Sequence, residues 1–370
     1  MGSGSGVLGD RRGEMKKRVK VVTIVGARPQ FIKAAPVSRV LRQQHTEILA
    51  HTGQHYDDNM SAVFFDELDI PEPDYNLGIG SGSHGAQTGA MLAAIEQVLV
   101  KEQPDWVLVY GDTNSTLAGA LTAAKLHIKI AHVEAGLRSF NRAMPEEINR
   151  VMADHLSDLL FCPSQTAVDN LAVEGISRGV HLVGDVMADA LAFAVERSQG
   201  RSQILLRFGL AAKKYLLVTV HRAENTDNHD RLKNILSALN SLSETVVFPV
   251  HPRTRLVIEK MDYTLQDHVL LSEPVGYLDM VQLEKSARMI LTDSGGIQKE
   301  AYWLSVPCVT LRDETEWLET VQAGWNVLVG ADKEAIVQAV RSFEPPAAHE
   351  VLYGNGKASE HIVQAFAAAG

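Results

Sequence analysis

Three acidic residues lie just after apolar runs of the sequence, where their carboxylates could transfer protons. Asp112 and Glu134 each follow such a run, and Glu146 lies in the segment after Glu134. Carboxylates act as general acids and bases when burial and neighbours move their pKa values apart. Two plainer explanations stay open. Asp112 could cap a helix, and Glu146 and Glu147 could favour the positive start of a helix after Pro145. We predict that Glu146 is the chemical member of its pair and Glu147 the supporting one.

The segment GARPQFIK joins an apolar run to a helix start and carries cations at Arg28 and Lys33. A helix N-terminus with cations nearby suits a phosphate group. The spacing matches neither the three-glycine dinucleotide fingerprint nor the P-loop, so it supports neither NAD binding nor ATP hydrolysis. For this segment alone, a surface turn with solvated cations is an equal alternative.

The segment DSGGIQKE is the sharpest local signal for a nucleotide. Ser294, Gly295 and Gly296 would place a hydroxyl group and bare backbone amides at a helix start, where they can surround phosphate oxygens. Glu300 lies four residues after Gly296 on the same helix face. Its carboxylate could accept hydrogen bonds from ribose hydroxyls.

Two other apolar runs are each followed by a histidine and an arginine, in HRAEN and in HPRT. A lone histidine after a strand is more often structural than catalytic, but two at equivalent sheet edges favour a function. Because neither His-Glu-x-x-His nor paired-cysteine spacing accompanies them, we expect no metal site. We predict that substrate contacts in this half come from Arg222, Glu224, Asn225, His251, Arg253 and Arg312.

These segments must be positioned by alternating strands and helices. From residue 19 the sequence repeats a β-branched run, a turn and a helical period, which is typical of parallel sheets covered on both faces. The expected strands of a first sheet are 19–25, 47–51, 105–110, 129–133, 159–162 and 180–183. Those of a second sheet are 215–220, 245–250, 268–271, 289–292, 308–311 and 327–329.

The fold class that we predict is α/β, with two Rossmann-like domains and a ligand cleft between them. The first domain would span 19–195 and the second 196–370, with the last helix able to pack back on the first domain. The boundary should fall near 190–212. We interpret residues 1–18, which are rich in Gly and Ser, as a disordered extension.

The composition sets limits on the class of protein. With 370 residues, 45% of them hydrophobic, the chain can bury the cores of two domains. A net charge of −10 argues against nucleic-acid binding. No apolar run is long enough to cross a bilayer, so we expect no membrane partner. Cys162 and Cys308 lie in apolar stretches that suit buried reduced thiols. We therefore expect a cytoplasmic protein.

The motifs GARPQFIK, YGDTNST, HVEAGLRS, PEEINR, HRAEN and DSGGIQKEA occur in one order. In this the sequence resembles the non-hydrolysing UDP-N-acetylglucosamine 2-epimerases, from about residue 19 to the C-terminal helix. The resemblance implies a glycosyltransferase-B fold, a homodimer, and elimination and re-addition of UDP through a 2-acetamidoglucal, without a cofactor. It implies a catalytic set of Asp112, Glu134, Glu146 and His221. It also implies UDP-sugar contacts from Arg28, Lys33, Ser294, Gly295, Gly296 and Glu300, and we predict a further contact from Arg138.

The sequence departs from the family pattern in ways that bear on substrate and regulation. The stretch RSFNR after Glu134 looks closest to the branch that acts on UDP-2,3-diacetamido-glucuronate in surface-polysaccharide synthesis. Arg142 could face such a carboxylate, or it could be a solvated loop residue. Gln30 stands where many members have Glu. In a second difference, Gln54-His55 is followed by Tyr56-Asp57. This second difference argues against the family's allosteric site. A retaining glycosyltransferase and a non-catalytic nucleotide-sugar binding module are the alternatives.

Overall fold

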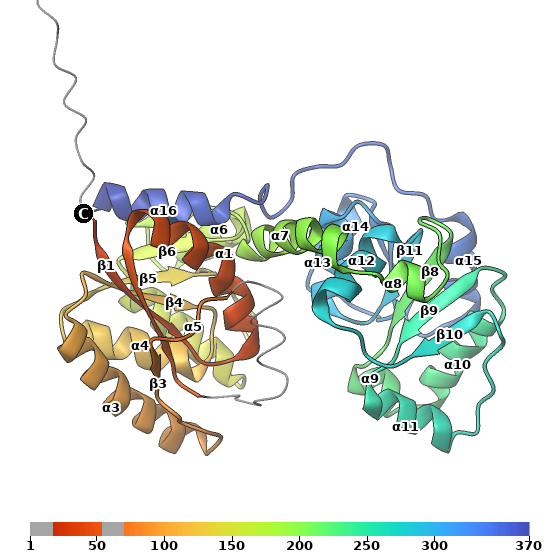
Figure 1. Cartoon of the computed structure of the whole chain (residues 1–370), viewed down its shortest axis with the longest axis horizontal. Coiled ribbons are helices and arrows are strands. Elements are labelled where there is room, and N and C mark those ends of the chain that lie inside the picture. The colour runs from red at the N-terminus through yellow and green to blue at the C-terminus, as the bar shows by residue number, and fades with distance from the viewer. Residues whose placement is uncertain (1–17, 54–69, 370) are drawn as a thin grey trace, which may run out of the picture.

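Two parallel β-sheets, each covered by helices, form the two lobes of the protein (Figure 1). The computed structural model describes residues 18–53 and 70–369. The predicted α/β class with two parallel sheets is therefore confirmed.

The first sheet has seven strands in the order β3-β2-β1-β4-β5-β6-β7, and all its pairs are parallel. Its central strands are apolar and fully buried, as expected for a sheet with helices on both faces. The strands are β1 (Lys20–Val25), β2 (Thr46–His51), β3 (Tyr75–Asn76), β4 (Trp106–Tyr110), β5 (Lys129–Val133), β6 (Leu159–Cys162) and β7 (Val180–Leu182). The helices of this lobe are α1 (Arg28–Gln44), α3 (His84–Glu102), α4 (Asn114–Lys125), α5 (Pro145–Leu156), α6 (Gln165–Val173) and α16 (Ala358–Ala369).

The second sheet has six strands in the order β10-β9-β8-β11-β12-β13, again all parallel. The strands are β8 (Tyr215–Thr219), β9 (Thr245–Pro249), β10 (Val269–Ser272), β11 (Met289–Thr292), β12 (Cys308–Thr310) and β13 (Asn326–Leu328). Around them lie α8 (Ile204–Arg207), α9 (Ala223–Thr226), α10 (His229–Asn240), α11 (Pro252–Lys260), α12 (Tyr277–Ser286), α13 (Gly295–Trp303), α14 (Leu318–Gln322) and α15 (Lys333–Ser342).

Both sheets reverse their strand order at one point, and this point decides where ligands can bind. The reversal lies between β1 and β4 in the first sheet and between β8 and β11 in the second. At such a switch point the connections leave the sheet in opposite directions, so a crevice opens beyond the carboxyl ends of the strands. The segments predicted to bind phosphate follow β1 and β11.

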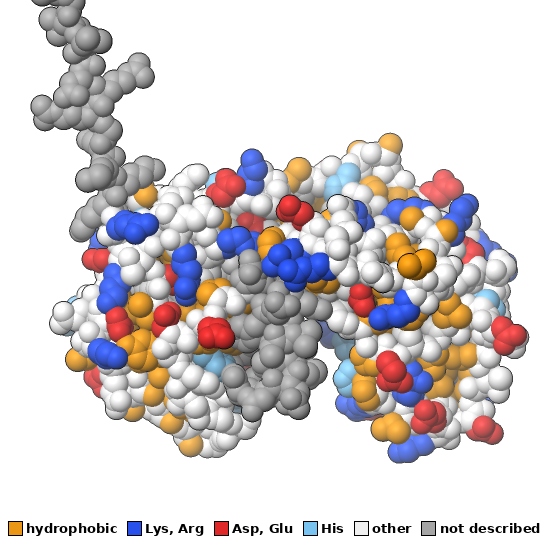
Figure 2. Space-filling model, viewed as in Figure 1, with side chains coloured by type: hydrophobic (Ala, Val, Ile, Leu, Met, Phe, Trp, Pro, Cys, Tyr) orange, Lys and Arg blue, Asp and Glu red, His pale blue; other side chains and the backbone are white. Residues whose placement is uncertain are grey.

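The lobes are joined by α7 (Val186–Arg201), which packs against α1 on one side and α12 on the other (Figure 1). The chain returns at its end, and α16 packs on α1 and α7. The ring of Phe366 lies 5.4 Å from that of Trp106 and anchors the last helix to the first core. Figure 2 shows a notch between the lobes, open on the side away from α7.

The expected strands match the observed ones closely. All twelve are present, and no strand end differs by more than one residue. The sequence pattern missed β3, which has only two residues and too little length for a period. The proposed domain boundary falls inside α7, and the division into domains stays a prediction.

Three further expectations concern membranes, metals and thiols. Among the described residues no helix is both long and apolar enough to cross a membrane. In the same part of the chain no cluster of three His, Cys, Asp or Glu side chains is placed to hold a metal ion. Cys162 and Cys308 are buried free thiols, and burial raises the pKa of each to about 12. Neither is a thiolate nucleophile at neutral pH.

Candidate functional site

Glu134 is held in a strained conformation at the end of β5. Its φ of +70° lies in the left-handed region, which costs a residue other than glycine about 1–3 kcal/mol. Its amide donates to the carbonyl of Phe161 on the neighbouring strand, which fixes the backbone there. Its Oε2 accepts a hydrogen bond from Nζ of Lys33 on α1. Strain of this kind persists where the surroundings enforce it, and it often marks a functional residue.

Lys33 carries its positive charge among carboxylates. Burial lowers the pKa of Lys33, but Glu134, together with Asp185 and Asp112, outweighs burial and raises that pKa. The ammonium group is therefore charged at neutral pH. Its side chain and that of Glu134 are each 16% exposed, so the pair is mostly shielded and still open to a ligand. Such a fixed cation stabilises negative charge that develops beside it.

Asp112 lies beside this pair and is held by α5. Its carboxylate accepts a hydrogen bond from the guanidinium of Arg150, and its carbonyl accepts one from Nδ2 of Asn149 at 2.9 Å. The side chain is 33% exposed, so a ligand can reach it. The alternative that Asp112 caps the following helix is wrong, because Thr113 is the cap residue of α4 and accepts from the amide of Thr116.

Glu146 and Glu147 have different environments in the first turn of α5. Glu147 is buried and accepts hydrogen bonds from the amides of Ser139 and Phe140 at 2.9 and 3.0 Å. Burial raises its pKa, but these bonds and Arg150 outweigh burial and lower it. Glu147 thus shapes the loop before α5, while Glu146 is exposed. Only Glu146 of the pair is available to a ligand in this conformation.

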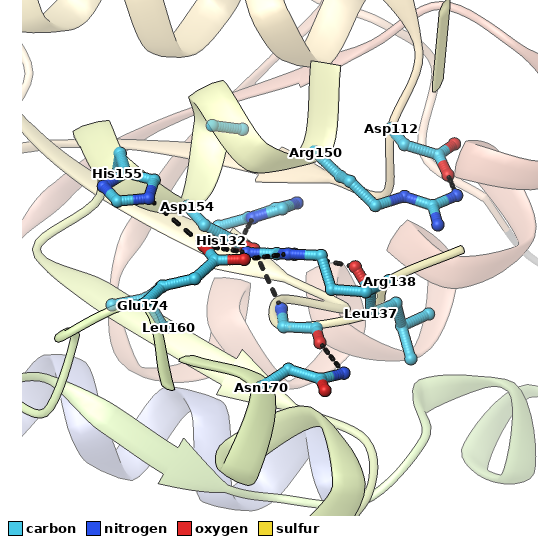
Figure 3. A network of polar contacts seen from close by, with 12 residues as sticks. Asp112, His132, Leu137, Arg138, Arg150, Asp154, His155, Leu160, Asn170 and Glu174 are labelled. Atoms are coloured by element: carbon cyan, nitrogen blue, oxygen red, sulfur yellow. Dashed lines mark hydrogen bonds and ion pairs between the residues drawn. The ribbon is translucent and has the colours of Figure 1, made fainter. Parts of the chain in front are cut away.

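A buried polar network lies behind these acids (Figure 3). His132 on β5 contacts Oδ1 of Asp154 through Nδ1 and donates through Nε2 to the carbonyl of Gly111, both at 2.7 Å. Burial lowers the pKa of His132, but Asp154 and Gly111 outweigh burial and raise it. Because Gly111 precedes Asp112, the imidazole fixes the backbone that presents this carboxylate.

The same network contains Arg138, and here the structure corrects a prediction. Its guanidinium donates to Asp154 at 2.7 Å and to Glu174 at 2.6 and 2.8 Å (Figure 3). The side chain is 1% exposed. Arg138 was expected to bind substrate, but its donors are directed to the buried carboxylate of Asp154 and the partly exposed one of Glu174, and a ligand cannot reach them. Its role in this structure is to neutralise Asp154 beneath the site.

In the second lobe, the fully buried Asp293 organises the end of β8. Its carboxylate accepts hydrogen bonds from the amides of His221 and Arg222 at 3.1 and 3.0 Å and from Nδ2 of Asn225 at 3.1 Å. The imidazole of His221 is 48% exposed, with Nδ1 3.5 Å from Asp293. Asp293 thus holds His221 on one side, and the rest of the imidazole is open to a ligand. Asn225 was expected to touch substrate, but it is fully buried and also donates to the carbonyl of Leu311.

Polar side chains face the first turn of α13 at Gly295, and we call this place, where we expect a phosphate to bind, the recess. Ser294 is its cap residue, and Gly295 follows. A Cβ atom on Gly295 would lie 3.3 Å from Nε1 of Trp317, 3.6 Å from Oε2 of Glu316 and 3.7 Å from Nη2 of Arg222. The missing side chain therefore lets a ligand approach the helix amides. An anion there would meet the positive end of the helix, an indole N–H and a guanidinium group, and also the carboxylate of Glu316.

Glu300 lies one turn further along α13 and is partly exposed, and its carboxyl interacts with that of the buried Glu284. Burial raises the pKa of Glu300 to about 7, although Lys299 lowers it. Burial and Glu300 together raise the pKa of Glu284 well above its usual range. The raised pKa values favour the neutral, protonated form of these carboxyls. A neutral carboxyl can donate as well as accept, which suits the hydroxyls of a ribose.

The other predicted contacts lie around this recess with partners in their own lobe. Arg312 is buried and donates to Glu316 at 2.8 and 3.2 Å. Arg253 is exposed and pairs with Asp227 at 2.7 Å, while His251 caps α11. Glu224 is exposed, 3.4 Å from a guanidinium nitrogen of Arg231. Their contacts with substrate stay predictions.

Two of the predictions fall on parts that are not described. The side chain of Arg28, at the start of α1, lies outside the described residues. So does the segment with Gln54, His55, Tyr56 and Asp57, on which the argument about allostery depends.

A family model described as UDP-N-acetylglucosamine 2-epimerase matches residues 39–367. The chain belongs to this family. It is 57% identical over 354 residues to a UDP-N-acetylglucosamine 2-epimerase homolog of Methanococcus maripaludis, covering 94% of this chain and 99% of that one. It is 52% identical over 357 residues to the UDP-2,3-diacetamido-2,3-dideoxy-D-glucuronate 2-epimerase of Pseudomonas aeruginosa, with the same coverage.

Solved structures agree with this membership. The UDP-GlcNAc 2-epimerase of Methanocaldococcus jannaschii, in complex with UDP-GlcNAc and UDP, has a TM-score of 0.79 and 46% identity, covering 95% of this chain and 100% of that one. A calicheamicin glycosyltransferase has a TM-score of 0.55 at 12% identity, which shows a shared fold alone. The resemblance read from the motifs is confirmed, and the glycosyltransferase alternative is not favoured.

The sequence motifs did not show which residues of this epimerase family member orient Asp112 and His221. Arg150 and Asn149 orient Asp112, and Asp293 orients His221. Arg150 and Asp293 stood inside quoted motifs, so the signal was present. What could not be read from the motifs was which polar side chain faces the ligand and which faces its neighbour.

Proposed function

We propose that this protein inverts carbon 2 of a UDP-linked 2-acetamido sugar by eliminating UDP and adding it back, without a redox cofactor. The observation that carries the proposal is the strained Glu134 paired with the partly buried Lys33, beside the accessible Asp112. Relatives that are 46–52% identical and named 2-epimerases support it.

The chemistry follows from the stereochemical demand. The C2–H bond breaks as UDP leaves C1, and the electron pair forms a C1–C2 double bond. To invert C2, the proton must then return to the opposite face while the diphosphate oxygen adds again to C1. One carboxylate cannot serve both faces, so an acid and a base on separate elements are required. We assign these roles to the set of Asp112, Glu134 and Glu146.

The departing diphosphate must be stabilised by groups other than Lys33 and Arg150, because these two cations are paired with Glu134 and Asp112. The α13 amides at Gly295 and Gly296, with Arg222 and the indole N–H of Trp317, supply this stabilisation in the recess. The carboxylate of Glu316 lies there too, with Arg312 and Arg222 as its cationic partners. His221 lies at the end of the neighbouring strand and is half exposed, next to this recess. We place it beside the leaving group.

The sugar substituents at C3 and C6 decide between two substrates. The relatives include enzymes named for UDP-N-acetylglucosamine and for the diacetamido-glucuronate. Arg142 lies exposed on the loop before α5, where it could pair with a uronate carboxylate. We propose the uronate as the preferred substrate, for surface-polysaccharide synthesis.

Proton NMR in deuterated water tests both statements. The purified protein receives UDP-N-acetylglucosamine or UDP-2,3-diacetamido-glucuronate and no acceptor. We expect loss of the C2 proton signal together with new manno signals, and a higher kcat/KM for the uronate. Bound sugars that stay unchanged in the absence of an acceptor would refute the epimerase function. A higher kcat/KM for UDP-N-acetylglucosamine would refute only the substrate preference.

We also propose that the protein acts in the cytoplasm as a homodimer. Met144, Ile148 and Met152 are spaced four residues apart on α5 and its cap, and they are 38–45% exposed. Such an apolar stripe suits a symmetric helix contact. Light scattering should give twice the chain mass, and Ile148→Glu should give the monomer mass; a monomeric parent protein would contradict the proposal.

The proposed location in the cytoplasm rests on the thiols. The free thiols of Cys162 and Cys308 fit a reducing compartment.

A further inference from the structure

A buried ion pair connects the two lobes next to the recess on α13. Nζ of Lys299, one turn beyond Gly295, lies 2.5 Å from Oδ2 of Asp185. Asp185 is the cap residue of α7 and lies three residues beyond the last strand of the first sheet, and its Oδ1 accepts from the amide of Met187. The two side chains are 9% and 4% exposed. Solvent and salt therefore screen this pair little.

Three aromatic rings surround the ammonium group of Lys299. Its Nζ lies 4.1 Å from the ring centroid of Trp317, 5.4 Å from that of Trp303 and 5.8 Å from that of Tyr353. All three distances fall within the range of cation–π attraction. The rings come from three segments, α13, the start of α14 and the return to α16. The cation is thus held by one carboxylate and by rings that fix its place.

The two passages of the chain between the lobes cross at this ion pair. The amide of Asp185 donates to the carbonyl of Tyr353 at 2.7 Å. Gly184 and Gly354 both have a φ of +93°, and a Cβ on Gly184 would lie 2.9 Å from Cα of Gly354. The pair therefore sits where any change in the angle between the lobes must be accommodated.

Each end of the pair reaches towards one half of the proposed site. Trp317, which holds the Lys299 cation on its ring face, points Nε1 towards Gly295, and this N–H has no hydrogen-bond partner among the described residues. On the other side, Asp185 is close enough to Lys33 to contribute, after Glu134, to the raised pKa of its ammonium group. The diphosphate recess and the acid–base centre are thus connected through one pair of charges.

We propose that Lys299 and Asp185 are positioning residues that hold α13, and with it the departed UDP, in line with the sugar intermediate near Glu134. The inference rests on the proposed function and adds the device that keeps the leaving group in place. Re-addition requires the diphosphate oxygen to stay aligned with C1, and a misplacement of about 1 Å can cost about a hundredfold in rate. Without the ion pair of Lys299 and Asp185, UDP and the glycal separate before re-addition.

The variants are chosen to remove the pair while keeping the local structure. Asp185→Asn keeps the helix cap, since Asn caps as well as Asp. Lys299→Met keeps the length of the side chain and its contact with the rings, and Lys299→Arg keeps the charge. The double variant leaves no unpaired charge and serves if one single variant fails to fold. Arg288→Met is the control, because it breaks a 2.6 Å ion pair with Glu244 inside the second lobe.

The readout is the number of UDP molecules released per sugar inverted at C2, measured with kcat, KM and the thermal midpoint. In Asp185→Asn and Lys299→Met, this ratio should rise about tenfold and kcat should fall about as much. UDP affinity should stay within about threefold. Lys299→Arg should restore the ratio, and Arg288→Met should not change it. An unchanged ratio, with activity lost only in proportion to unfolded protein, would overturn the proposal, as would an equal rise in Arg288→Met.

A second measurement does not depend on turnover. Small-angle X-ray scattering with and without UDP reports how far the lobes close. We expect Lys299→Met to show a smaller UDP-dependent decrease in radius of gyration than the parent protein and Arg288→Met. Equal decreases in the parent protein, Lys299→Met and Arg288→Met would overturn the proposal that the ion pair positions α13. If the parent protein inverts no UDP-sugar, the proposed function fails, and the scattering comparison still decides this inference.

Discussion

At the scale of residues, the site depends on a few side chains whose neighbours set their charge. Glu134 is strained and paired with Lys33, and Asp112 is paired with Arg150. Each acid therefore has a cation that holds its carboxylate in place until substrate arrives. The two cations come from different helices, Lys33 from α1 and Arg150 from α5, so the two carboxylates are fixed independently of each other.

Replacing Glu134 with Gln should lower kcat by about a thousandfold, because the amide cannot exchange a proton with C2. UDP affinity should change less than about threefold, since the recess on α13 is intact. Isotope exchange at C2 and UDP titration measure the two effects. Glu174→Gln is the control, because it removes a carboxylate bound to Arg138 behind the site. Equal losses of kcat in both variants would assign Glu134 a structural role.

At the scale of elements, the network around His132 joins β4, β5 and α5 through buried charges. Replacing His132 with Gln should lower the free energy of unfolding by about 3 kcal/mol, as breaking a buried pair does. His155→Gln, on the exposed edge of the network, should cost less than about 0.5 kcal/mol. Urea unfolding measures both. Similar costs for the two variants would contradict the argument.

The cost of removing His132 should depend on pH in a defined direction. The pKa of His132 is raised in the folded protein from its ordinary 6.5. The charged imidazole therefore contributes its full stability below 6.5 and loses it as pH rises through the raised value. Asp154 has a lowered pKa because His132 and Arg138 outweigh burial, so its contribution is lost only in acid. The difference in unfolding free energy between the parent protein and His132→Gln should shrink towards alkaline pH; growth in that direction would exclude a charged imidazole.

Elements and site were not equally predictable from the sequence. Strands such as β5 and β11 are continuous apolar runs between turn signals, so their ends could be read directly. Polar residues just beyond them could be expected at the site. Arg138 and Asn225 meet the same condition and proved to be buried supports, because the pattern does not say which way a side chain points. The pair of Asp185 and Lys299 is separated by 114 residues, and although Lys299 lies inside the segment DSGGIQKE, nothing in the sequence connects it to Asp185.

At the scale of the whole molecule, two lobes are joined by passages that cross at glycines. Gly184→Ala should destabilise the protein by at least about 1 kcal/mol more than Gly175→Ala. Both positions have positive φ, but only the new methyl group at 184 would meet backbone atoms, since nothing lies within 4 Å of a Cβ at 175. Thermal unfolding of the two variants gives the comparison. Equal midpoints would show that the crossing is not tightly packed.

The central claim is that UDP leaves C1 and returns without being lost. Substrate with ¹⁸O in the oxygen that bridges C1 and the β-phosphorus tests it most directly, because a freed diphosphate can rotate. Phosphorus NMR should show ¹⁸O moving from the bridge to the terminal β-phosphate oxygens at a rate comparable to C2 inversion, and no movement with Glu134→Gln. The same measurement is made with Asp185→Asn, in which the diphosphate is held less firmly. Inversion at C2 with all ¹⁸O still in the bridge in both the parent protein and Asp185→Asn would contradict elimination and re-addition.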